Sequence, residues 1–223
     1  MSLKNLIPFY THNSEENFEY KFSVFTPVYN RADTLHRVFT SLNNQTFKDF
    51  ELIIINDGSS DNSHQVIEAL IKKANFKVRY INNKENRHKM ACFIQAIGIA
   101  NGEFLLPFDS DDKCSSDALE VFFKEYENIP NNKKANISGV TCLCIDQNGK
   151  LVGKPFSIQP YYSNTFNENL KNNNNLEKWG FTKTSILKSI NIDDKIFSKG
   201  YIPEGLIWEL ISKEGFQTKY IND

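Results

Sequence analysis

The fold is decided by the stretch FELIIINDGSSD, residues 50–61, in which an apolar run passes directly into a polar turn. Residues 52–55 are apolar at every position, and successive side chains of a strand point to opposite faces. A strand that is apolar on both faces is typical of the centre of a parallel sheet with helices on each side. The stretch therefore predicts a central strand over residues 50–56 that ends in a turn.

Strand-like and helix-like segments alternate on either side of this stretch. Further strands are predicted at residues 21–26, 78–82 and 103–107. Apolar residues at helical spacing predict helices around residues 35–42, 66–71, 93–97 and 119–126. This order predicts an α/β fold with a mostly parallel central sheet flanked by helices.

The alternation weakens after about residue 130. A strand is still predicted at residues 137–145 and a helix at residues 204–213, whereas Asn172 to Asn175 predict a loop. We therefore divide the chain into an extension (1–19), a first half (20–130) and a second half (131–223) of one domain.

Composition limits the kinds of ligand and location. The chain has 223 residues and a net charge of −1, from 26 Lys and Arg against 27 Asp and Glu, which gives no general attraction to nucleic acid. The sequence has neither a signal peptide nor a run of the ~20 apolar residues that a membrane span requires, so a cytoplasmic protein is expected. The four cysteines lack CxxC spacing and are expected to be reduced thiols.

Polar loops follow the strands predicted at residues 21–26, 50–56 and 103–107, and such loops meet at the carboxyl edge of a parallel sheet. The third loop holds Asp109, Asp111 and Asp112, whose mutual repulsion a bound cation would relieve. Oxygen ligands favour Mg²⁺ or Mn²⁺, and such an ion can bridge the phosphates of a nucleotide diphosphate. An acidic cap at a helix start is the alternative interpretation.

The turn after the central strand also has two interpretations. Gly58 and the serines that follow suit an ordinary turn and helix cap. Asp57, directly after the strand, could in addition accept hydrogen bonds from a base or a ribose hydroxyl. Both interpretations can hold together.

Five segments resemble, in order and spacing, the family-2 glycosyltransferases. They are FTPVYNR (25–31), LNNQTF (42–47), FELIIINDGSSD (50–61), ANGE (100–103) and DSDD (109–112). The resemblance covers about residues 22–128. It implies a GT-A fold, the Rossmann-like fold of nucleotide-diphospho-sugar transferases, a nucleotide-sugar donor that is usually a UDP-sugar, and Mn²⁺ or Mg²⁺ at the DxD motif.

The resemblance also implies roles for individual residues. It puts the nucleotide on Pro27, Tyr29 and Arg31, with Asp57 at the uracil. In the DxD motif Asp111 contacts the metal and Asp109 faces the ribose or sugar. Ser110, Asp112 and Lys89 complete the predicted donor site. His88 stands where the family commonly has glycine.

Inverting transfer requires a base that removes the proton of the acceptor hydroxyl. The family places this carboxylate near an acidic pair before a helix in the second half, and this chain has no Glu-Asp pair there. We choose Glu204, at the exposed start of the predicted helix, with Glu209 as the reserve. A charge that merely complements the helix N-terminus is the alternative for Glu204.

Two tryptophans are candidates for acceptor binding. Trp179 and Trp208 could each stack on the apolar face of a sugar, and each could equally be a core residue.

The expected function is metal-dependent, inverting transfer of a sugar from a nucleotide-diphosphate sugar to a hydroxyl of a saccharide or lipid-linked acceptor. Richness in Lys and Asn suggests a bacterial protein, with a role in surface polysaccharide synthesis and peripheral association with the inner face of the membrane. A sugar nucleotidyltransferase is one alternative, although residues 26–31 lack the glycines of its phosphate loop. A non-catalytic carbohydrate- or nucleotide-binding module is the other.

Overall fold

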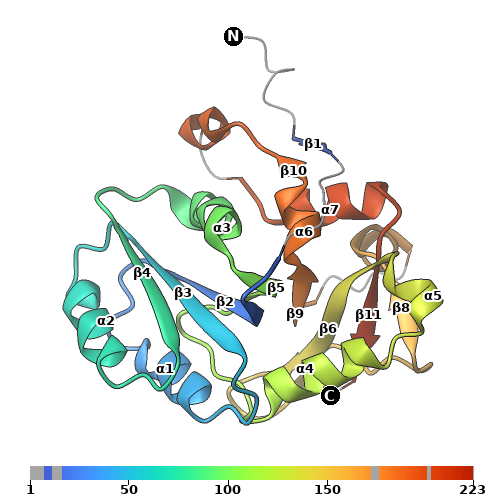
Figure 1. Cartoon of the computed structure of the whole chain (residues 1–223), viewed down its shortest axis with the longest axis horizontal. Coiled ribbons are helices and arrows are strands. Elements are labelled where there is room, and N and C mark those ends of the chain that lie inside the picture. Colours follow the sequence, from blue (N-terminus) through green and yellow to red (C-terminus); the bar gives the residue numbers. More distant parts are fainter. Residues whose placement is uncertain (1–7, 12–16, 172–175, 200–201, 223) are drawn as a thin grey trace.

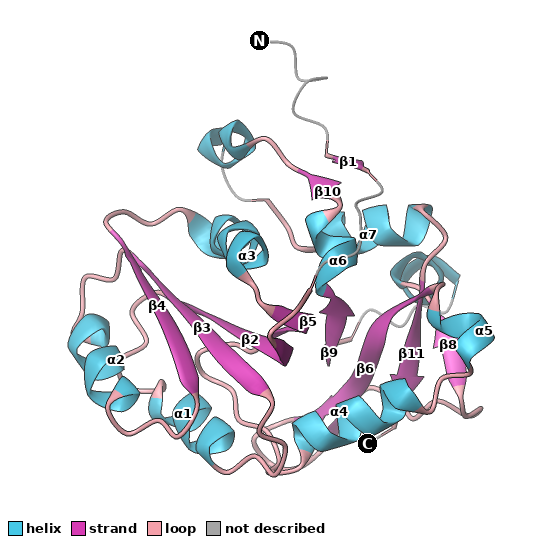
Figure 2. Ribbon diagram, viewed as in Figure 1, coloured by secondary structure: helices cyan, strands magenta, loops and turns pink. Residues whose placement is uncertain are grey.

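The computed structural model describes residues 8–11, 17–171, 176–199 and 202–222, which fold around one large sheet (Figures 1 and 2). The order of strands in this sheet is β4-β3-β2-β5-β9-β6-β11-β8, and β7 pairs with β6 outside that path. The strands are β2 (Tyr20–Val28), β3 (Phe50–Asp57), β4 (Lys77–Asn83), β5 (Gly102–Pro107), β6 (Ile137–Ile145), β7 (Leu151–Val152), β8 (Tyr161–Ser163), β9 (Lys178–Lys183) and β11 (Gln217–Ile221). A separate small pair joins β1 (Phe9–Tyr10) to β10 (Ile190–Asn191). The predicted loop at 172–175 lies outside the described residues.

The helices lie on both faces of the sheet (Figure 1). They are α1 (His36–Asn43), α2 (Ser63–Ile71), α3 (His88–Ile99), α4 (Ala118–Glu127), α5 (Asn131–Lys134), α6 (Thr184–Lys188) and α7 (Gly205–Lys213). One apolar cluster joins α1, α2 and α4 to one face, and a second joins α3, α6 and α7 to the other. Alternate residues of β3 supply both clusters, Leu52 and Ile54 to the first and Ile53 and Ile55 to the second. The predicted α/β fold with helices flanking the sheet is confirmed.

The first half of the sheet is entirely parallel. β2 pairs with β3 and β5, and β3 pairs with β4, all in parallel. Every residue of β3 is buried, as its apolar run predicts. β2 runs two residues past the predicted end, through Pro27. Pro27 is tolerated because its ring nitrogen faces the β5 side, where pairing ends at Phe25 and Pro107.

The second half of the chain extends the same sheet with mixed pairing. β9 is antiparallel to both β5 and β6, β11 is parallel to β6, and β8 is antiparallel to β11. Gly139 and Gly180 lie where β6 and β9 approach closely, because a Cβ on either glycine would meet the backbone of the opposite strand. Within the large sheet, the two halves of the chain are joined by the ladder between β5 and β9.

A buried charge ties the amino ends of the parallel strands together. Glu51 of β3 has no exposed surface, and its Oε1 accepts hydrogen bonds from Ser23 Oγ (2.8 Å) and the Asn101 N–H (2.9 Å). Its Oε2 lies 2.8 Å from Arg79 Nε of β4. Because a buried carboxylate is stable only when it is paired and hydrogen-bonded, Glu51 of β3 links β2, β4 and the residue before β5 at the edge opposite the polar loops.

Two further expectations can be compared with the structure. None of the four cysteines, all of which lie in the described ranges, forms a disulfide. None of the helices in the described ranges has the length and apolar character needed to cross a membrane.

The close approach of β6 and β9 gives the first prediction. Gly139→Ala would press a methyl group against the Phe181 carbonyl, so we expect it to lower the free energy of unfolding by about 2 kcal/mol or more. Gly98→Ala is the control, because a Cβ there meets no atom within 4 Å and should raise helix stability by up to about 1 kcal/mol. Urea unfolding measures both variants, and equal stabilities would contradict the close approach.

Candidate active site

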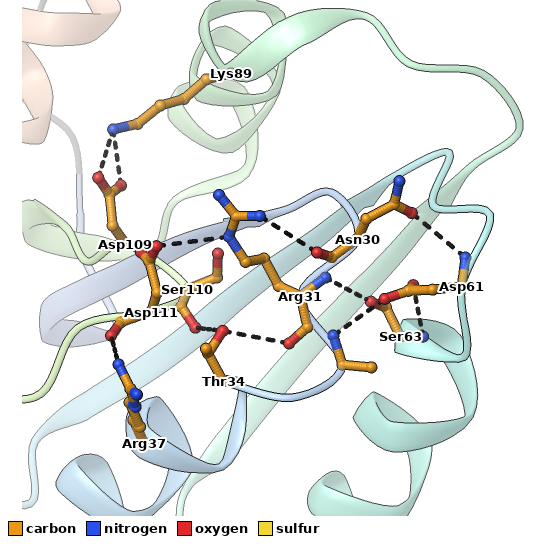
Figure 3. A network of polar contacts seen from close by, with 11 residues as sticks. Asn30, Arg31, Thr34, Arg37, Asp61, Ser63, Lys89, Asp109, Ser110 and Asp111 are labelled. Carbon is orange, nitrogen blue, oxygen red and sulfur yellow. Dashed lines mark hydrogen bonds and ion pairs between the residues drawn. The ribbon is translucent and has the colours of Figure 1, made fainter.

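The three polar loops after β2, β3 and β5 meet at the carboxyl edge of the parallel strands, as the sequence predicts (Figure 3). Asn30 joins the first two loops. Its Oδ1 accepts hydrogen bonds from the backbone N–H groups of Ser60 (2.8 Å) and Asp61 (3.3 Å), and its own N–H donates to Ser59 Oγ (2.9 Å). Asn30 has a φ of 52°, a left-handed conformation that asparagine tolerates better than most residues. One side chain thus fixes the path of two loops.

Arg31 points from the first loop towards the acidic loop after β5 (Figure 3). Its N–H donates to Ser63 Oγ (3.0 Å), and its Nε lies 3.5 Å from Asp111 Oδ2. The next residue, Ala32, donates its N–H to Asp61 Oδ2 (3.2 Å). Partial burial acts to raise the pKa of Asp61, but hydrogen bonds from Ser63 and Ala32 outweigh it and lower that pKa. Arg31 and Asp111 are each about half exposed, so this ion pair is weak and can exchange for a ligand.

The backbone of the acidic loop is held from α1. Thr34 Oγ1 donates to the Ser110 carbonyl (3.0 Å) and Arg37 donates to the Asp111 carbonyl (2.8 Å). Burial, followed by the charges of Asp109 and Asp111, raises the pKa of Asp112.

Lys89 of α3 bridges the two halves of the chain. Its Nζ lies 2.7 Å from Asp109 Oδ1 and 2.8 Å from Glu204 Oε1. Burial acts to lower the pKa of Lys89, but the charges of Asp109 and Glu204 outweigh it and raise the pKa to about 12, so the ammonium stays charged at neutral pH. Glu204 thus faces the acidic loop, whereas Glu209 is exposed on α7 and does not line the adjoining cavity.

Asp57 is only 3% exposed and holds the loop between β4 and α3. Both of its oxygens lie 3.0 Å from the Arg87 N–H, and Asn83 Nδ2 donates to Oδ1 (3.4 Å). Gly58 has a φ of 68°, and a Cβ there would collide with the backbone of residues 85–86. His88 also has a φ of 68°, so it keeps the left-handed conformation that glycine would adopt most easily.

A cavity of about 380 Å³ runs from the acidic loop into the second half of the sheet. The end of the cavity beside the acidic loop, here termed its mouth, is lined by Lys89, Asp109, Asp112 and Glu204. The predicted donor residues Pro27, Tyr29, Arg31, Asp57, Ser110 and Asp111 are not among its lining residues. The candidate residues are thus divided between the cavity and the loops at the sheet edge.

Both tryptophans line this cavity and also pack against other aromatic rings. Trp179 donates from Nε1 to the Pro107 carbonyl (2.6 Å), and its ring centroid lies 5.2 Å from that of Phe122. Trp208 packs against Phe93 with a centroid distance of 5.9 Å. Each ring is therefore packed as the core interpretation predicts, at a position that also borders the cavity.

The acidic loop suits a metal ion that arrives with a ligand. Among the described residues, no three His, Cys, Asp or Glu side chains come close enough together to hold a metal ion. Mg²⁺ typically uses one or two carboxylates and completes its shell with phosphate oxygens and water. Asp111 is about half exposed, and the pKa of Asp112 is raised first by burial and then by the charges of Asp109 and Asp111, which a cation would offset. These residues fit an ion bound together with a nucleotide diphosphate.

Sequence reasoning missed three residues that position the site: Asn30, Thr34 and Arg37. Asn30 could have been found from its place after a strand, where asparagine often adopts a left-handed turn. No comparable pattern marks Thr34 or Arg37, whose partners are carbonyl groups of a loop distant in sequence.

Comparisons with known proteins identify the family of the chain. The family model described as Glycosyl transferase family 2 matches residues 23–190. The GalNAc(5)-diNAcBac-PP-undecaprenol beta-1,3-glucosyltransferase of Campylobacter jejuni is 29% identical over 195 residues, 87% of this chain and 60% of that protein. The cholesterol galactosyltransferase of Borreliella burgdorferi is 34% identical over 124 residues, 56% of this chain and 32% of that protein. The chain thus spans less than two thirds of the length of either relative.

Solved structures show the same fold. TarS 1-349 of S. aureus aligns with a TM-score of 0.61 and 24% identity, covering 91% of this chain and 58% of that one. Its complex with UDP-GlcNAc aligns with a TM-score of 0.59 and 24% identity, covering 91% and 56%. The predicted GT-A fold is confirmed by this likeness.

The buried carboxylate of Asp57 gives the second prediction. Asp57→Ala leaves the Arg87 N–H without its acceptor, so we expect the free energy of unfolding to fall by about 1–3 kcal/mol and the Arg87 amide to exchange faster. Asp57→Asn keeps an oxygen acceptor, so its free energy of unfolding should fall by less than that of Asp57→Ala. Asp33→Ala, at an exposed position, is the control. Hydrogen exchange measures the amide, and unchanged protection in Asp57→Ala would contradict this role.

Proposed function

The chain belongs to glycosyl transferase family 2, and on that premise we propose that it transfers a sugar from a UDP-sugar to an acceptor hydroxyl with inversion. The observation that carries the proposal is the bridge from Asp109 through Lys89 to Glu204. It sets the acidic loop of the first half beside a carboxylate of the second half, at the mouth of a cavity. Donor phosphates and an acceptor hydroxyl both need groups of these kinds within reach of one another.

The donor is proposed to lie on the loops at the sheet edge. Pro27, Tyr29 and Arg31 would contact the nucleotide, and the exposed Arg31 can exchange Asp111 for a phosphate. Asp57 is proposed at the uracil, because a carboxylate has about four lone-pair sites and can accept further hydrogen bonds beyond that from Arg87. The UDP and UDP-GlcNAc complexes of TarS support this choice of nucleotide.

The diphosphate is proposed to lie beside the acidic loop. Asp111 would hold Mn²⁺ or Mg²⁺, with Asp109, Ser110 and Asp112 around the sugar and ribose. The bound ion would neutralise charge on the leaving diphosphate. Lys89 has three N–H donors, so it can contact a phosphate oxygen while it keeps one of its carboxylate partners.

Glu204 is proposed as the general base. It would take the proton of the acceptor hydroxyl while that oxygen forms a bond to the anomeric carbon. The bond from the anomeric carbon to the diphosphate oxygen breaks at the same time, and the diphosphate leaves with the electron pair from the opposite face. The Lys89 ammonium, 2.8 Å from Oε1, orients the Glu204 carboxylate towards the mouth of the cavity.

The acceptor is proposed to be a bacterial surface saccharide or a lipid-linked glycan, reached from the second half of the chain. The name of the Campylobacter jejuni relative specifies an undecaprenol-linked saccharide acceptor. An acceptor of that kind would bring the protein to the inner face of the membrane as a peripheral component. Trp179 and Trp208 would line its path.

The metal assignment gives the third prediction. Asp111→Asn should abolish the gain in UDP affinity that Mn²⁺ gives the unaltered protein, because it removes the proposed ligand. Isothermal titration of UDP with and without Mn²⁺ measures this gain. Asp117→Asn, an exposed position near the start of α4, is the control and should retain the gain. An unchanged gain in Asp111→Asn would contradict the assignment, and tighter binding of GDP, CDP or dTDP would contradict the uridine donor.

The base assignment gives the fourth prediction. Glu204→Gln should lower kcat by roughly 10²–10⁴-fold while it leaves UDP affinity nearly unchanged, because the base acts on the acceptor. Glu209→Gln should stay close to the unaltered protein, since its side chain does not line the cavity. Equal losses in both variants would overturn the choice of Glu204. Donor binding by a chain that shows no turnover on any acceptor would favour the non-catalytic module.

A further inference from the structure

The cavity beside the acidic loop lies over the second half of the sheet, and we refer to it below as the groove. Phe181 of β9 packs in the apolar cluster on the α4 face, so its neighbours Gly180 and Thr182 present the opposite face to the groove. Thr141 of β6 and Thr218 of β11 line the same groove. This face of the sheet carries small and hydroxyl side chains where the first half of the sheet carries aliphatic ones. Its composition suits a polar ligand.

A buried carboxylate forms part of the wall of this groove. Glu168 lies in the π-helical segment Asn167–Lys171, is only 2% exposed and accepts a hydrogen bond from Tyr161 Oη (2.6 Å). Tyr220 lines the groove as well. A carboxylate has about four lone-pair sites, so Glu168 can accept hydrogen bonds from the hydroxyl groups of a sugar in addition to the one from Tyr161. The proposed reaction itself assigns no role to Glu168.

The charge of the groove limits what can enter it. Its lining contains more carboxylates than ammonium groups: Asp109, Asp112, Glu168, Glu177 and Glu204 against Lys89 and Lys178. Like charges repel strongly in a site that is partly shielded from water. A ring that bears a carboxylate or phosphate group is therefore disfavoured, whereas a neutral ring meets no such barrier. The volume of about 380 Å³ is within the range of small-molecule sites.

We infer that this groove is the acceptor subsite and that it takes a neutral, hydroxyl-rich sugar ring, with Glu168 accepting hydrogen bonds from the hydroxyl groups of the ring. The inference rests on the proposed transferase function. The same groove excludes uronic acids and phosphorylated sugars by its charge. Residues that line the groove, Glu168 among them, thus set the specificity for the acceptor, whereas Glu204 acts as the base.

The test uses simple glycosides as probes, in the presence of UDP and Mg²⁺. Binding of p-nitrophenyl β-glucoside, β-galactoside and β-glucuronide, and of glucose 6-phosphate, is followed by saturation-transfer NMR with competition. We expect the best neutral glycoside to bind at least about fivefold more tightly than either anionic probe. Glu168→Gln should lower the affinity for that glycoside by about five- to tenfold, because it removes a charged acceptor. The difference in affinity between the glycoside and the glucuronide should also become smaller.

Two further variants separate a local effect from a loss of folding. Thr182→Val keeps the shape of a side chain that lines the groove but removes its hydroxyl group. This variant should also have a lower affinity for the neutral glycoside. Glu214→Gln changes an exposed charge outside the groove and should leave the affinity for the glycoside unchanged. Affinity for UDP with Mg²⁺ should be the same in every variant, which shows that each one is folded.

The outcomes distinguish this inference from the proposed function. If the unaltered chain does not bind UDP with Mg²⁺, the proposed function is overturned. If UDP binds but the glucuronide equals or exceeds the glucoside, or no glycoside binds, the acceptor subsite is wrong while the donor site stands. The subsite is equally wrong if Thr182→Val and a folded Glu168→Gln both leave glycoside affinity unchanged.

Discussion

Burial of β3 on both faces is the constraint on which the rest of the structure depends. All eight of its residues are buried, so helices must cover both sides of the sheet and its neighbours must run parallel to it. Parallel strands send their following loops to one edge, and the three polar loops therefore meet there. At the opposite edge Glu51 ties the amino ends of the same strands together. The polar site therefore lies at one edge of a sheet whose central strand is fully buried.

The loops at the carboxyl edge are preorganised by hydrogen bonds from backbone N–H groups to the side chains of Asn30 and Asp57, whereas ion pairs that a ligand can replace hold the acidic loop. Asn30 and Asp57 fix backbone paths through N–H groups, and neither contact needs to break for a ligand to bind. Arg31 and Lys89 instead hold the acidic loop by ion pairs at partly exposed positions. Such pairs contribute little to stability, so a ligand with phosphate groups can take over the cations at little cost. Asn30 and Asp57 thus fix the loop backbones, whereas Arg31 and Lys89 can exchange their carboxylate partners for a ligand.

The second half of the sheet differs from the first because β9 enters between β5 and β6 in the antiparallel direction. Antiparallel sheets can bury one face and leave the other to solvent or ligand. Here Phe181 and Val140 pack in the apolar cluster that includes α4, and the opposite face carries Thr141, Gly180 and Thr182. The groove proposed for the acceptor follows from this one-sided burial, and α7 brings Glu204 to its mouth.

Local periodicity was sufficient to predict the strands and helices of the first half, because burial on one or two faces leaves a repeat of two or 3.6 residues. It also placed Asp109 and Asp111 at the strand edge and Glu204 at a helix start. The tertiary structure decided what periodicity does not encode. Glu204 is the residue immediately before α7 and Glu209 lies within that helix, and only the docking of α7 brings Glu204 to Lys89. The burial of Asp57 and the position of Glu168 in the groove depend on contacts between distant segments, which a local pattern of apolar residues cannot report.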